Sequence, residues 1–157
     1  MNDHISISPL MAVSYPSPDF EIRVIKDKQM IWDGIRKKYV KLTPEEWVRQ
    51  NFLQYLIQHA HYPPTLMAIE KEIRSGELKR RCDIVIYKES HPWMIIECKE
   101  PGTSINENAL RQILGYNMTL QVDYLVLTNG DYTYGMKCDV HGGQFITSFP
   151  DYYIKNN

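Results

Sequence analysis

Two apolar runs that carry acidic residues constrain the fold of this chain more than any other feature. Residues Cys82–Tyr87 and Trp93–Lys99 read as strands, and only a short polar segment separates them. Because side chains alternate across a strand, Glu97 and Lys99 are expected to share a face. If the strands are neighbours, Asp83 can sit beside Glu97. Charged residues are rarely buried unless they are paired or bind a metal, so this arrangement indicates a functional site.

Two bare carboxylates at that range repel each other, so one would take up a proton or a cation would bind between them. A hard divalent ion such as Mg²⁺ fits best, with substrate phosphate oxygens completing its shell. Lys99 beside the ion could hydrogen-bond an attacking water or a scissile phosphate, the chemistry of metal-assisted phosphodiester cleavage. The rival interpretation is plain ion pairing, of Asp83 with Arg81 or Lys79 and of Lys99 with a neighbouring glutamate.

The rest of the chain predicts two helices and several further strands. Thr43-Pro44-Glu45-Glu46 starts a helix that reaches about Ala60, with Thr43 as its cap. Ser104-Ile105-Asn106-Glu107 reads as a second capping box, opening a helix to about Leu120. Since this helix separates two apolar runs, it predicts a crossover with parallel pairing. Alternation at Phe20–Ile25 and Met30–Leu42 indicates strand or hairpin structure. Further strands are expected at Leu66–Ile73, Leu78–Tyr87, Tyr124–Thr128, Tyr132–Cys138 and Gln144–Phe149.

The second helix offers two more candidate site residues. Gln112 and Tyr116 are four positions apart and therefore lie on one helical face. A helix that leaves the Glu97 strand directly can bring this face back towards Glu97. Gln112 could then orient the nucleophile, and Tyr116 could contact phosphate or stack on a base. On an amphipathic helix the default interpretation is a polar rim and a core aromatic.

Length and composition favour one domain over residues 1–157, with the proline-containing residues 1–20 as an extended arm. The formal net charge of −1 gives no overall basic signature of a nucleic-acid-binding protein. Three cysteines without a CxxC spacing are expected to be reduced core residues. No apolar segment approaches eighteen residues, so no membrane association and a cytoplasmic location are expected.

Asp83, Glu97-Cys98-Lys99 and Gln112-x-x-x-Tyr116 resemble the motifs of the PD-(D/E)xK nuclease superfamily. More narrowly, about residues 30 to 135 are similar to the N-terminal nuclease domain of type I restriction enzyme R (HsdR-like) subunits. The segments that carry this similarity are Leu42–Gln50, Arg81–Asp83, Ile96–Lys99 and Leu127–Gly130. The resemblance implies an α/β (α+β) fold with a restriction-endonuclease-like αβββαβ core, a central mixed sheet flanked by helices. Cys82 stands where the superfamily name has proline.

The resemblance also implies an activity, that of a Mg²⁺- or Mn²⁺-dependent endodeoxyribonuclease of a bacterial-type restriction-modification system. It assigns the metal to Asp83, Glu97 and the Cys98 carbonyl, and the family often adds an acid from the first helix, here Glu46 or Glu45. It gives Lys99 a catalytic role, with Gln112 and Tyr116 in support. Candidates for contact with nucleic acid are Arg36, Arg49 and Arg81.

Other interpretations stay open beside this one. Glu46 is by default a capping-box carboxylate, and Arg36 and Arg49 form ordinary ion pairs by default. The chain could be a non-catalytic DNA-binding or assembly module with the same fold, and RNA is an alternative substrate. R subunits carry an ATP-driven motor. In this chain Gly130–Gly135 has the glycine spacing of a phosphate-binding loop, but the Lys-Ser/Thr that should follow is missing, so no ATP site is expected there. Restriction-modification subunits or a separate motor are therefore expected partners, and a dimer is one open arrangement.

Overall fold

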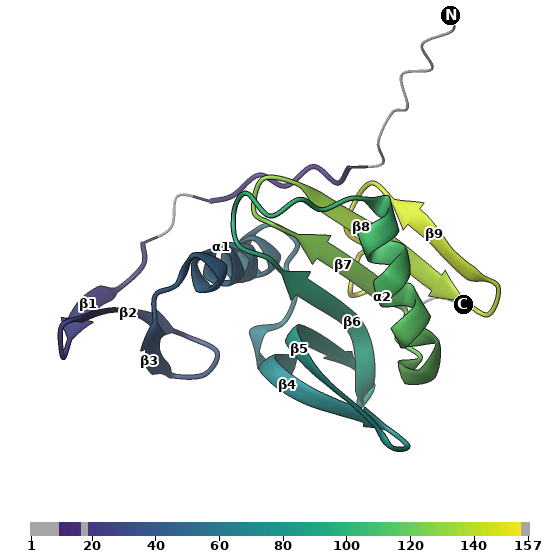
Figure 1. Ribbon diagram of the computed structural model, residues 1–157, viewed down its shortest axis with the longest axis horizontal. Coiled ribbons are helices and arrows are strands. Elements are labelled where there is room, and N and C mark those ends of the chain that lie inside the picture. The colour runs from purple at the N-terminus through teal and green to yellow at the C-terminus, as the bar shows by residue number, and fades with distance from the viewer. Residues whose placement is uncertain (1–9, 17–18, 155–157) are drawn as a thin grey trace, which may run out of the picture.

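The computed structural model describes residues 10–16 and 19–154, and within them not the side chains of residues 75 and 116–120. A six-stranded sheet with the order β4-β5-β6-β7-β8-β9 forms the centre of this part, and a separate three-stranded sheet lies to one side (Figure 1). Two helices accompany the sheets. The predicted α+β fold with a central mixed sheet is confirmed.

The smaller sheet contains β1 (Ile22–Ile25), β2 (Lys28–Asp33) and β3 (Lys38–Lys41). The first helix, α1, covers Pro44–Gln58, and a 3-10 turn, η1, covers Pro64–Leu66. The second helix, α2, covers Glu107–Leu120. The central sheet is built from β4 (Met67–Ser75), β5 (Leu78–Lys88), β6 (His91–Cys98), β7 (Tyr124–Thr128), β8 (Thr133–Asp139) and β9 (Gly142–Ile146).

The topology of the central sheet follows the predicted order. Strands β4, β5 and β6 form an antiparallel meander, and β7 runs parallel to β6 after the α2 crossover. The turn from β5 to β6 is shorter than the polar segment of residues 88–92 between the two apolar runs, because β5 continues to Lys88 and β6 begins at His91. The two residues between them, Glu89 and Ser90, have φ of 52° and 66°, as a tight hairpin turn with positive φ at both central positions requires.

Each helix covers one face of the central sheet (Figure 1). On one face, Phe52 and Leu56 of α1 pack with Ile96 of β6. On the other, Leu110 of α2 packs with Ile95. Successive side chains of β6 thus pack into the hydrophobic cores on the two faces of the sheet, as expected for a strand buried on both sides.

Local hydrogen bonds set two element boundaries that the sequence pattern did not. The segment Met30–Leu42 is two strands, since the Asp33 carboxylate accepts the N–H groups of Ile35 and Arg36 and closes a turn between β2 and β3. Helix α2 begins at residue 107, because the side chain that accepts a first-turn N–H belongs to Asn106, at 2.9 Å from the nitrogen of residue 109. Asn106 and not Ser104 is therefore the cap.

Alternation fails in β4 and β5 beside the predicted site. Cys82 packs on the α2 side of the sheet, whereas Ile84, two residues on, packs on the α1 side. In β4, Glu70 interrupts the pairing with β5 and has φ of 51°. Asp83 bonds to α1 while Val85 packs on the α2 side, so the two residues do not share a face as regular alternation would require.

The described part of the predicted N-terminal arm lies along β8. Leu10 forms an isolated bridge with Tyr134, and the Met11 N–H donates to the Thr133 carbonyl at 2.9 Å. Residues 1–9 and 17–18 of that predicted arm lie outside the described residues. Among the helices described, none has the length and apolar character needed to cross a bilayer.

Candidate active site

The two carboxylates singled out in the sequence come together at the ends of adjoining strands. Ile84 pairs with Ile96, and one further step in this antiparallel register sets Asp83 opposite Glu97. Asp83 Oδ2 accepts the N–H of Cys98 at 2.8 Å, which fixes its carboxylate at the end of β6. The side chains of Asp83 and Glu97 are only 15% and 12% exposed. The register of the β5–β6 hairpin therefore brings the two predicted carboxylates to adjoining strand ends.

The Glu97 carboxyl is difficult to ionise in this position. Burial raises its pKa from the ordinary 4.5 to about 7, and the negative charge of Asp83 adds to the effect. Arg80 opposes the shift through its Nη2, 2.7 Å from Glu97 Oε1. The pair thus behaves as adjacent like charges in a poorly solvated site, and a bound cation would favour its ionised form.

Arg49 of α1 occupies the other side of the pair. Its Nη2 lies 2.8 Å from Asp83 Oδ1, and its Nη1 lies 2.9 Å from Glu46 Oε2. The guanidinium is only 5% exposed. Arg36 is similarly engaged, pairing with Asp33 and Glu46 and leaving 15% of its side chain exposed. In this structure both arginines, predicted as nucleic-acid contacts, bind carboxylates.

The two glutamates at the start of α1 take different positions. The Glu46 N–H donates to the Thr43 hydroxyl at 3.1 Å, so Thr43 is the cap as predicted. The Glu46 carboxylate, however, binds two arginines instead of completing the capping box. Glu45 lies nearer the acidic pair: burial raises its pKa and Asp83 raises it further, while Lys99 acts in the opposite direction. Of the two helical acids, Glu45 is the one whose charge interacts with Asp83.

Lys99 follows directly after β6 and is exposed. Its backbone N–H donates to the Thr128 carbonyl of β7 at 2.8 Å. Its ammonium group lowers the pKa of Glu45, which places this positive charge within electrostatic range of the acidic end of α1. The structure therefore brings Asp83, Glu97 and Lys99 to one region of the molecule.

The two α2 candidates are less closely tied to this region. Gln112 is an exposed residue of the helix. Tyr116 lies on the same helix, but its side chain falls outside the described residues. Their supporting roles stay predictions.

Glu70 of β4 is a further acidic neighbour of the site. Its Oε2 lies 2.9 Å from an Arg81 nitrogen and 3.5 Å from Arg36, and its Oε1 lies 3.6 Å from Arg49. Glu70 has a left-handed backbone conformation, with φ of 51°, and is missing from the pairing of β4 with β5, so strand alternation does not predict its position. The side chain of Arg81, which pairs with Glu70, is 70% exposed.

The residues present fit a hard divalent cation better than a softer metal. Asp83 and Glu97 supply carboxylate oxygens at one point, and Mg²⁺ is commonly held by one or two carboxylates plus substrate phosphates and water. Within residues 10–16 and 19–154, no group of three or more His, Cys, Asp and Glu side chains could hold a metal. The carbonyl of Cys98, predicted as a third ligand, belongs to the backbone and is not part of such a group.

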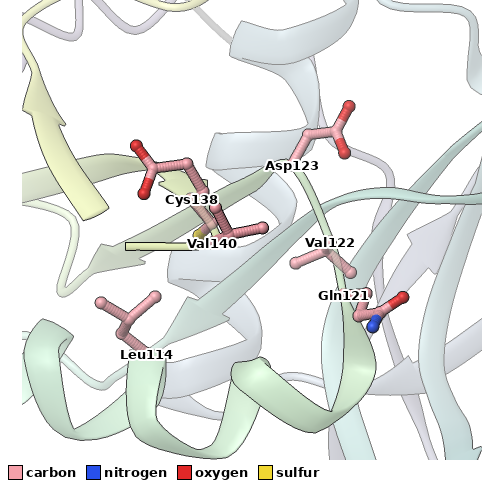
Figure 2. Close-up of a pocket in the computed structure, with 7 residues that line it drawn as sticks. Leu114, Gln121, Val122, Asp123, Cys138 and Val140 are labelled. Carbon is pink, nitrogen blue, oxygen red and sulfur yellow. The ribbon is translucent and has the colours of Figure 1, made fainter. Parts of the chain in front are cut away.

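A groove of about 660 Å³ leads along the acidic end of α1. Its walls include Glu45, Arg49 and Glu70, with residues of β2 and β3 on the facing side. A second concavity of about 460 Å³ lies beside α2 and is drawn in Figure 2. It includes Asp123, just before β7, whereas Glu97 pairs near the other end of that strand. The groove reaches the carboxylate pair through Arg49, which lines it and binds Asp83.

Comparison with known families decides what kind of chain carries this site. Residues 44–150 match the family described as the type I restriction enzyme R protein N terminus. The chain belongs to this family. The resemblance to the N-terminal domain of type I restriction enzyme R subunits is thereby confirmed, and the match includes α1 and every strand of the central sheet. No sequence among the curated proteins matches the chain.

Proposed function

We propose that the chain is a metal-dependent endodeoxyribonuclease module that hydrolyses DNA phosphodiester bonds. The observation that carries the proposal is the pair of poorly solvated carboxylates, Asp83 and Glu97, at adjoining strand ends in a chain of the R protein N-terminal family. A bound cation would compensate the charge of the two carboxylates and so offset the cost of burying them side by side.

In this proposal, Asp83, Glu97 and the Cys98 carbonyl hold Mg²⁺ or Mn²⁺, and Glu45 is the candidate for a further acidic ligand. When bound, the metal supplies a lowered water pKa and neutralises charge that develops on the phosphate. Asp83 is oriented by two groups, the Cys98 N–H and Arg49, so its carboxylate is held in place before substrate arrives.

Lys99 has the role of hydrogen-bonding the attacking water or a phosphate oxygen. Its position directly after β6, together with its effect on Glu45, supports this assignment. A positioned ammonium stabilises negative charge that grows in the transition state, an effect typically of several kcal/mol. Gln112 and Tyr116 are proposed to support the substrate, and restriction-modification subunits in a bacterial-type cytoplasm are the proposed setting.

Nicking of supercoiled DNA tests the proposal directly. In Mg²⁺ or Mn²⁺ the wild-type chain should convert supercoiled to open-circular DNA, and EDTA should stop the reaction. Glu97→Ala and Lys99→Ala should each slow nicking by at least about a hundredfold. Lys71→Ala and Glu72→Ala are charge-matched controls at exposed residues of β4, and both should retain the wild-type rate.

Persistent nicking in both site variants would reject the assignment. A non-catalytic DNA-binding or assembly module is the rival, favoured by the arginines that already bind both carboxylates. It predicts salt-dependent DNA binding that Glu97→Ala leaves unchanged, without cleavage by the wild type. A competition reaction that contains both DNA and RNA substrates distinguishes a deoxyribonuclease from a ribonuclease.

A further inference from the structure

The basic residues of this nearly neutral chain are concentrated in the smaller sheet. Residues 22–41 hold seven of the 18 lysines and arginines, against two of the 19 acidic residues. One of those two, Asp33, is fully buried and bound to Arg36 and Gln50. The part of the chain outside this sheet is therefore acidic overall, and the sheet is the region whose charge complements a polyanion.

One face of this sheet is turned to solvent. In β2, Ile31 and Asp33 are fully buried, whereas Trp32 between them is 38% exposed. Trp32 pairs with Tyr39 of β3, and Met30 pairs with Lys41, so these four residues share the outer face. We call this the β1–β3 outer face; its other members are Arg23, Ile25 and Lys28.

Aromatic rings and cations alternate on the β1–β3 outer face. The rings of Trp32 and Tyr39 meet edge to face, with centroids 5.2 Å apart. The Arg23 guanidinium lies 5.2 Å from the centroid of the Tyr39 ring. Glu21 also contacts this group, accepting from the Tyr39 hydroxyl and pairing with Arg23. Exposed rings among cations are the arrangement that binds single-stranded nucleic acid, by base stacking and phosphate contact.

The β1–β3 outer face is continuous with the groove beside the carboxylates. Met30, Tyr39 and Lys41 line that groove together with Glu45 and Glu70. A strand that stacks on the sheet can therefore pass into the groove, where Glu45 interacts with Asp83. Figure 1 shows the smaller sheet beside the start of α1, the helix that separates it from the central sheet.

We propose that the β1–β3 outer face binds a single-stranded segment of DNA and leads it to the carboxylate site. The proposal rests on the proposed function for DNA as the substrate. It commits to unpaired bases because stacking on Trp32 requires an open base face, which a duplex hides. The family match begins at Pro44 and assigns nothing to this sheet.

Fluorescence anisotropy in EDTA tests the proposal without cleavage. A labelled single-stranded oligonucleotide and its duplex are titrated with the full chain over a range of salt concentrations. The wild type should bind the single strand more tightly. The double variant K28Q/K41Q should lower the slope of log affinity against log salt by about 1.4, since each lost phosphate contact removes about 0.7.

A ring substitution tests the stacking component. Trp32→Leu should weaken single-strand binding by at least about fivefold, with little change in the salt slope. Matched controls are K71Q/K137Q, which removes two exposed lysines from the central sheet, and Tyr153→Leu, which removes a ring that is 66% exposed. Both controls should bind as the wild type does.

Several outcomes would overturn the proposal: no single-strand binding by the wild type, tighter duplex binding, or equal affinity in the K28Q/K41Q variant and its control. Circular dichroism confirms the fold of each variant, and K28Q/K41Q decides the question if Trp32→Leu does not fold. Failure here with normal nicking would reject the sheet as the binding face and leave the nuclease proposal standing. Normal binding without nicking would reject the nuclease proposal and leave the sheet as the binding face.

Discussion

At the residue scale, the site is a balance between two carboxylates and two guanidiniums. Asp83 and Glu97 lie at adjoining strand ends, and each is bound by an arginine, Arg49 on one side and Arg80 on the other. Arg80 offsets the effects of burial and of Asp83 only in part, because the pKa of Glu97 is still about 7. The Glu97 carboxyl therefore titrates in the range where most enzymes work.

The raised pKa of Glu97 predicts how stability depends on pH. The folded protein keeps a proton on Glu97 between about pH 4.5 and 7, whereas the unfolded chain has lost it. Stability from this group therefore falls as pH rises through that window, by about 1.4 kcal/mol per pH unit. Glu97→Gln, which mimics the protonated form, should be about 3 kcal/mol more stable than wild type at pH 8 and equally stable at pH 4.

Urea unfolding in EDTA at several pH values measures this difference. Glu72→Gln, at an exposed glutamate paired with Arg74, is the control and should show no such pH-dependent gap. Mg²⁺ should narrow the gap at pH 8, because a ligand that binds only the folded, ionised site stabilises the wild type. A gap that stays constant from pH 4 to 8 would contradict a perturbed Glu97.

Arg49 is predicted to be the most stability-sensitive basic residue of the site. Arg49→Met removes the guanidinium that pairs with Asp83 and leaves Glu46 with Arg36 as its remaining arginine. Breaking such a buried ion pair typically costs about 3–5 kcal/mol. The exposed Arg74, which pairs with Glu72, provides the comparison, and Arg74→Met should change stability by less than about 1 kcal/mol. Thermal unfolding measures the loss of stability in Arg49→Met and in Arg74→Met. Equal losses would show that the ion pairs of Arg49 do not stabilise the fold.

Strand alternation predicted the pairing of Asp83 with Glu97 but not their partners. A hairpin between two adjacent apolar runs has few registers, so the two acids were certain to lie near each other once both runs were strands. Arg49 and Glu70 reach the site for another reason. The phase of β4 and β5 changes at Glu70, whose φ of 51° has no signature in a glutamate among strand-forming residues.

At the element scale, helix starts show what a local signal can and cannot decide. Thr43 caps α1 as predicted, because it is followed by proline and two acids. Before α2, the chain offers both Ser104 and Asn106, and either suits a cap. The structure selects Asn106, whose side chain accepts a first-turn N–H, and the four-residue pattern alone does not distinguish the two candidates.

This difference gives a paired test of α2. Asn106→Ala removes the acceptor of a first-turn N–H and should cost about 1 kcal/mol of stability. Ser104→Ala, two residues earlier and outside the helix, should cost less than about 0.5 kcal/mol. Chemical denaturation of the two variants decides between the alternatives, and a larger loss in Ser104→Ala would restore the cap expected from the sequence.

At the scale of the whole molecule, the sequence predicted the central sheet and its crossover because apolar runs and capping signals mark them plainly. It did not predict that β1–β3 would form a sheet of their own. That separation arises from the Asp33 turn and from the ion pairs of Arg36 with Asp33 and Glu46, which join distant segments. It also separates charge, with a basic sheet beside an acidic site.

The central claim is that Asp83 and Glu97 together hold one divalent cation. Electron paramagnetic resonance with Mn²⁺ measures this directly, since bound Mn²⁺ is lost from the free-ion signal. At pH 8 the wild type should bind one Mn²⁺ at a site that Asp83→Asn and Glu97→Gln each remove, while Glu72→Gln retains it. Equal Mn²⁺ binding in all four proteins, or none in the wild type, would contradict the account.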